Sequence, residues 1–155
     1  KEASQAQIIE NWADTTLAKS IKIVFLEELT KNPILISSLF ANEISDSIQK
    51  LFFNIPSKIA SQISGLINQK EKESLKSNLE YLSNLIDKEN FIIGEKLSIA
   101  DIAVASHLSL LKFPNSSGEN LTGKGCSLYI NDPSLQNLFQ WRDFIEGQLT
   151  KTNYN

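Results

Sequence analysis

The sequence FIIGEKLSIADIAVASHLSLL, residues 91–111, predicts a helix whose start is unusually well marked. Ser98 suits the N-cap position, and Asp101, three residues later, can accept a hydrogen bond from the backbone of the cap, as in a capping box. Asp101 also lies in the first turn, where its charge faces the positive end of the helix dipole. Leu97 before the cap and Ile102 at the fourth helical position can form a hydrophobic staple. All four signals place the helix start directly after Ser98.

The residues that follow Asp101 are apolar on nearly every face of this predicted helix. They are Ile102, Ala103, Val104, Ala105, Leu108, Leu110 and Leu111. A helix of this kind is expected in the middle of a core, and at about 12 to 14 residues it is too short to cross a bilayer. We therefore expect residues 98–112 to form a buried central helix.

Three further segments have the apolar spacing of helices, and no segment has convincing strand alternation. Residues 4–30 predict one long helix that ends at Asn32-Pro33. Residues 71–88 predict an amphipathic helix. Asp132-Pro133 opens a last helix, with proline at its first position.

The remaining segments are less regular. Residues 33–70 predict an irregular helical insertion, 114–131 a loop rich in Gly, Asn and Ser, and 150–155 a frayed tail. The chain as a whole therefore predicts a single all-α domain over residues 1–155, a helical bundle built around residues 98–112.

Composition limits the partners of the chain. It has 155 residues, 15 basic and 18 acidic, and a formal net charge of -3, so no overall positive field would attract nucleic acid or anionic lipid. Its single cysteine excludes an internal disulfide and suits a reducing compartment, and no targeting or membrane segment is visible. We expect a cytoplasmic protein that binds neither nucleic acid nor membranes. The first residue is Lys1 and the chain has no methionine, which predicts a piece of a longer protein.

The reactive residue types do not form a catalytic or metal-binding set. His107, the only histidine, is expected to be a hydrogen-bonded core residue rather than a base, because no nucleophile pattern accompanies it. One His and one Cys do not make a metal site. Cys126 is expected in a flexible loop beside Lys124, which could lower its pKa; we favour a spectator thiol and leave a reactive one open. Asp14 and Asp143 are expected to be solvated.

The opening stretch also resembles the signature of the C-terminal domain of glutathione S-transferases, in which a glycine turn leads into a Ser/Thr-x-x-Asp capping box on a buried helix. The matching positions are Phe91, Gly94, Ser98, Ala100, Asp101 and Ile102. Residues 12–17, WADTTL, are similar to the first long helix of bacterial members, and residues 132–135, DPSL, to the start of their late helix. Trp141 falls one turn later than the tryptophan that often follows, and residues 33–68 would be a longer insertion than usual.

The resemblance implies a partner domain. A complete transferase has an N-terminal thioredoxin-like domain, which binds glutathione and supplies the residue that activates its thiol. Nothing in this sequence resembles that domain. We therefore expect no catalytic residue and no cofactor in this chain, with glutathione as the co-substrate of a complete protein. The resemblance also allows a homodimer of that protein.

The resemblance further implies which residues face the second substrate, a small hydrophobic electrophile. In the family, the wall of that site comes from the first long helix and from the end of the buried helix. The matching residues here are Trp12, Thr16, Ser20, Leu110 and Phe113. Ordinary core packing or contact between domains explains the same residues equally well.

A second interpretation is a non-catalytic adaptor, because the same helical domain serves in protein assembly in translation factors and some aminoacyl-tRNA synthetases. The consecutive apolar residues Leu51, Phe52 and Phe53 in the insertion could form a docking surface. They could equally insert into the core. We favour the substrate-binding half of a transferase-like protein and leave the adaptor open as the alternative.

Overall fold

The computed structural model describes residues 1–40, 69–87 and 89–152, and every regular element in these residues is helical. The predicted all-α class is confirmed. The only extended pairing among them is an isolated bridge between Lys112 and Gly125. The elements are α1 (Glu2–Trp12), the π-helical η1 (Ala13–Leu17), α2 (Ala18–Lys31), α3 (Pro33–Phe40), α6 (Gln69–Ile86), α7 (Ile99–Leu111), the 3-10 turn η2 (Asn115–Ser117), α8 (Ser127–Ile130), the 3-10 turn η3 (Pro133–Leu135) and α9 (Gln136–Thr152).

The long helix predicted for residues 4–30 is confirmed as the continuous run α1–η1–α2, but its π-helical segment was not predicted. The run ends at Asn32, which leaves the helical conformation at φ -125°. The side chain of Asn32 then accepts a hydrogen bond from the backbone N–H of Leu35 at 3.0 Å, so that one residue ends α2 and caps α3.

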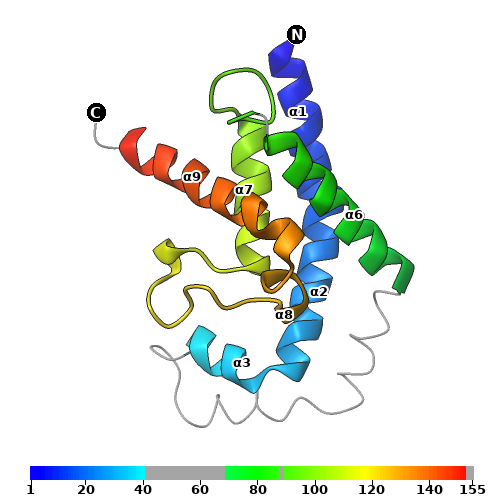
Figure 1. Cartoon of the computed structure of the whole chain (residues 1–155), viewed down its shortest axis with the longest axis vertical. Coiled ribbons are helices and arrows are strands. Elements are labelled where there is room, and N and C mark those ends of the chain that lie inside the picture. Colours follow the sequence, from blue (N-terminus) through cyan, green and yellow to red (C-terminus); the bar gives the residue numbers. More distant parts are fainter. Residues whose placement is uncertain (41–68, 88, 153–155) are drawn as a thin grey trace.

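Helix α7 lies beside this long run and in the same direction, while α6 and α9 cross the pair obliquely (Figure 1). It contacts α1, η1, α2 and α9, which confirms its central place. Its burial is less complete than predicted, because Ile99 and Ile102 in its first turn are 47% and 37% exposed.

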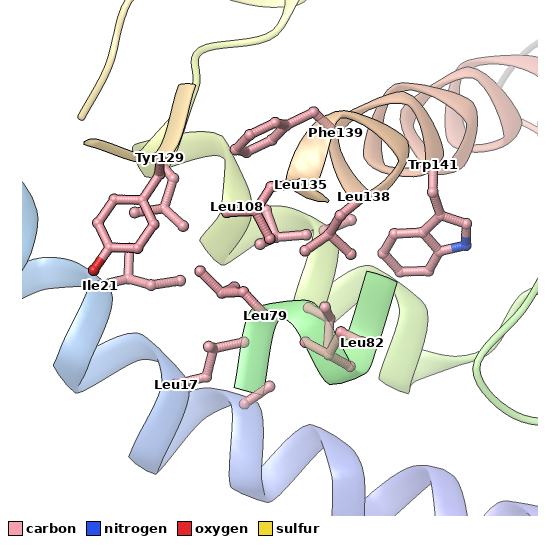
Figure 2. Packing of buried hydrophobic residues seen from close by; sticks show 14 of the residues in the cluster. Leu17, Ile21, Leu79, Leu82, Leu108, Tyr129, Leu135, Leu138, Phe139 and Trp141 are labelled. Atoms are coloured by element: carbon pink, nitrogen blue, oxygen red, sulfur yellow. The ribbon is translucent and has the colours of Figure 1, made fainter. Parts of the chain in front are cut away.

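The core fills the space between the long run, α6, α7 and α9. Figure 2 shows side chains from these helices meeting around Leu108 of α7. Fully or almost fully buried members include Ala13, Leu17, Ile21, Leu75, Leu79, Val104, Leu108, Leu111, Leu135, Leu138, Phe139 and Ile145. Burying this much apolar surface is the main stabilising contribution to the fold.

The segment predicted as a loop, residues 114–131, contains the short helices η2 and α8. The part of the loop that returns toward α7 is bound to the end of that helix. The N–H of Cys126 donates to the carbonyl of Leu111 at 2.8 Å. Gly125 makes this approach possible, because a Cβ there would lie 2.1 Å from the Leu111 oxygen. The loop is therefore held by backbone contacts that composition alone did not indicate.

The other irregular segments are only partly described. Residues 33–40 of the predicted insertion form α3, and residues 41–68, with Leu51, Phe52 and Phe53, lie outside the described residues. The predicted tail is helical through Thr152, because α9 continues past Leu149, and residues 153–155 also lie outside. No described helix is both long and apolar enough to span a membrane.

Candidate functional site

The start of α7 is organised by one buried carboxylate. Asp101 Oδ2 accepts from the backbone N–H and the hydroxyl of Ser98, at 2.8 and 2.6 Å, while Oδ1 accepts from the backbone N–H of Ile92 at 2.7 Å. Asp101 is fully buried. Its side chain thus holds the helix start and the preceding turn together, whereas sequence reasoning had assigned it the helix start alone.

Two of the predicted wall residues, Thr16 and Ser20, border a shared hollow. It measures about 260 Å³, and its other lining residues include Ile23 of α2 and Glu71 of α6. Thr16 is exposed and Ser20 is half-buried. Trp12 precedes Thr16 by one helical turn and packs partly against the core. This half of the predicted wall is thus a polar, open surface with an aromatic residue one turn away.

The other two predicted residues, Leu110 and Phe113, face a different neighbour. The ring of Phe113 packs edge-to-face on Phe25 of α2, with 5.9 Å between centroids. Phe113 is buried, and Leu110 packs partly against the core. In this structure the pair supports the joint between α2, the end of α7 and the following loop, and the hollow at Thr16 does not include it.

His107 and Asp14 form a polar pair that sequence reasoning missed. His107 Nε2 lies 2.9 Å from Asp14 Oδ1, with 18% of the histidine side chain and 58% of the aspartate side chain exposed. His107 is hydrogen-bonded, as predicted, but it lies at the edge of the core rather than inside it. The Asp14 carboxylate is partly exposed to solvent and contacts His107. The residues are 93 positions apart, so periodicity alone gave no signal of their contact.

Cys126 is buried rather than placed in a flexible, exposed loop. Burial, followed by the nearby charges of Glu28 and Glu27, raises the pKa of its thiol to about 12. Burial likewise raises the pKa of Tyr129 to about 12. A thiol with these properties is protonated at neutral pH and inaccessible, which fits the spectator role.

The remaining predicted acid, Asp143, is half-exposed and accepts from Arg142 Nε at 2.7 Å. Arg142 itself is almost completely buried, and its Nη1 donates to the carbonyl of Lys112 at the end of α7. A buried arginine on an amphipathic helix is difficult to foresee from sequence, because periodicity places it among the apolar positions without naming its acceptors. Its role is to join α9 to α7.

Metal-ligating residues do not gather in the part of the chain that the structure describes. No group of three or more His, Cys, Asp or Glu side chains there is arranged to hold a metal ion. The polar features of the site are therefore the Asp101 carboxylate, the Asp14–His107 pair and the hollow at Thr16.

Comparison with known families shows one similarity. The family model for the glutathione S-transferase C-terminal domain matches residues 57–125. These residues are therefore similar to the glutathione S-transferase C-terminal domain family. The resemblance predicted from residues 91–111 is confirmed over this segment, which is somewhat less than half of the chain. No curated protein and no solved structure matched the chain.

The matched residues, 57–125, include α6, α7 and the loop that follows α7 as far as Gly125. Leu110 and Phe113 therefore lie in the matched residues. Trp12, Thr16 and Ser20 lie on the first long run, outside them. The family match accordingly includes the central helix and does not include the first half of the predicted wall.

Proposed function

We propose that this chain is the helical half of a cytoplasmic glutathione S-transferase-like protein and that it binds the hydrophobic second substrate. Its partner in that protein is an N-terminal thioredoxin-like domain, and glutathione is the co-substrate of the two together. The match to the transferase C-terminal domain across the capped helix α7 carries the proposal. A homodimer of the complete protein is compatible with it.

The contribution of this chain to the reaction is binding and orientation. Trp12 would offer an aromatic surface to the electrophile, and Thr16 and Ser20 would border it with hydroxyl groups. Holding an electrophile next to a thiol replaces a bimolecular encounter with an oriented one, which lowers the activation barrier. The chain alone would not conjugate, because the thiol-activating residue belongs to the partner domain.

Titration of the folded chain with a chloronitrobenzene, a small apolar electrophile, tests the binding half of the proposal. We expect saturable binding by calorimetry, at least tenfold weaker in Thr16→Arg, because the long charged side chain would fill a hollow that Lys19 already lines. Tyr81→Arg is the matched control, since Tyr81 is exposed on α6 away from this surface. Equal binding by both variants would show that the electrophile does not use the hollow.

The adaptor interpretation has one observation in its favour. Ile8 of α1 is 69% exposed, and Ile99 and Ile102 of α7 are also exposed, so single apolar side chains on both helices are accessible to a partner. The coding sequence upstream of this chain separates the two functions. A thioredoxin-like segment with a proline-containing loop and a Glu-Ser or Asp-Ser pair supports the enzyme, and any other domain supports the adaptor.

A further inference from the structure

The π-helical segment η1 interrupts the long first helix at the level of the predicted ligand surface. Its defining hydrogen bond runs from the N–H of Ala18 to the carbonyl of Ala13, one residue further than in an α-helix. A single π turn rotates the residues before it relative to those after it, and such turns recur at functional sites. Here Trp12 lies directly before the turn and Thr16 within it, so the turn sets their relative orientation.

Two side-chain interactions hold this turn. The hydroxyl of Thr15 donates to the carbonyl of Asn11 at 2.6 Å, a bond back to the preceding turn that favours helix distortion. The carboxylate of Asp14 meets His107 Nε2 at 2.9 Å. Because a carboxylate can only accept, Nε2 carries the proton in this pair.

The two partners of the Asp14–His107 pair differ in burial. His107 is on α7, next to Leu108, which is fully buried, and three residues after Val104, which is also fully buried. Asp14 is on the irregular turn and is mostly exposed. The pair therefore joins the π-helical turn to a helix in which Val104 and Leu108, beside His107, are fully buried.

We infer that His107 is a positioning residue: through Asp14 it holds η1 in its π form and thereby sets the orientation of Trp12 and Thr16. The role of these two residues in ligand binding rests on the proposed function. The effect of His107 on the turn does not. Without the bond, the regular α-helical register competes with the π turn, and the turn becomes more dynamic.

Hydrogen exchange of the backbone amides of residues 14–18 tests the inference. We expect Asp14→Ala and His107→Ala each to accelerate exchange in these residues about three- to tenfold, the range set by a partly exposed charged hydrogen bond. His107→Gln, which retains a donor at the same distance along the side chain, should return most of the protection. Ser106→Ala is the control, because Ser106 is exposed and bonds only within α7.

Unchanged exchange in both alanine variants would overturn the inference, as would an equal acceleration in all helices, which reports general destabilisation. Chloronitrobenzene affinity gives the second measurement: it should fall in His107→Ala and recover in His107→Gln. Unchanged affinity alongside faster local exchange would refute the link to Trp12 and Thr16. If the wild-type chain binds no chloronitrobenzene, the proposed function fails, and the exchange result still decides the role of His107 at the turn.

Discussion

At the scale of single residues, Asp101 satisfies three donors with one carboxylate, two from Ser98 and one from Ile92. Asp101→Ala leaves the buried N–H of Ile92 without this acceptor and removes the Asp101 half of the capping box, so we expect a loss of about 2 to 4 kcal/mol in unfolding free energy. Asp101→Asn, which retains an oxygen acceptor, should lose less. Urea denaturation of the three proteins measures the difference; an unchanged midpoint in Asp101→Ala would show that these contacts are not stabilising.

Replacing either of two glycines with alanine should change the stability of the fold, in opposite directions. Gly125 has φ +153°, and its Cβ would overlap the carbonyl of Leu111, so Gly125→Ala should destabilise by about 2 kcal/mol or more. Gly147 lies inside α9 with open space around it, so Gly147→Ala should stabilise by about 0.5 to 1 kcal/mol. Thermal unfolding of both variants provides the test. Destabilisation by Gly147→Ala would mean that α9 is not regular at that position.

Cys126 should be unreactive in the folded protein. A pKa of about 12 leaves roughly one thiol in ten thousand ionised at pH 8, and the side chain is fully buried. Labelling with iodoacetamide at pH 8 should therefore be very slow in buffer and rapid in urea. Rapid labelling of the native chain would reopen the reactive interpretation.

At the scale of elements, Glu27 joins α2 to α6. It is buried and pairs with Lys31 at 2.5 Å and with Lys72 of α6 at 2.7 Å. Burial acts to raise its pKa, but the hydrogen bonds from Lys31 and Lys72 outweigh it and leave the pKa below the ordinary 4.5. The folded state therefore favours the carboxylate, and this contribution to stability is present above about pH 4.5 and lost as the pH falls through the lower folded-state pKa.

Glu27→Gln tests this link between helices. At pH 7 we expect the variant to be less stable than the wild type by about 1 to 3 kcal/mol, because two lysines lose their charged partner. As the pH falls below about 4.5 the gap should narrow, since protonation makes the wild-type side chain neutral as well. Urea denaturation of both proteins at several pH values measures this difference in stability. A gap that is constant with pH would mean that the charge of Glu27 is not responsible.

The elements themselves could largely be predicted from sequence, because their signals are local. The capping residues near Ser98, the stop at Asn32 and the proline at position 133 each act within one turn of the chain. The π turn could not be predicted, because it depends on His107, far away in sequence. The burial of Cys126 was missed for a similar reason: the fit of Gly125 against Leu111 is a tertiary contact.

At the scale of the whole molecule, α7 organises the bundle, and the family match includes it. The sequence indicates this arrangement because a helix that is apolar on nearly every face is stable in water only when it is buried in a core. The site was less accessible to prediction. Thr16 and Ser20 share a hollow, whereas Phe113 packs on Phe25, and such groupings depend on how helices rotate against each other, which periodicity does not determine.

Calorimetric titration with glutathione tests whether this chain supplies the helical half of a glutathione-dependent protein. The titration is performed on this chain and on the product of the complete gene. We expect the complete product to bind glutathione and this chain alone not to bind it. Absence of binding by both would contradict this expectation and favour the adaptor, and binding by the isolated chain would contradict the assignment of the glutathione site to a separate domain.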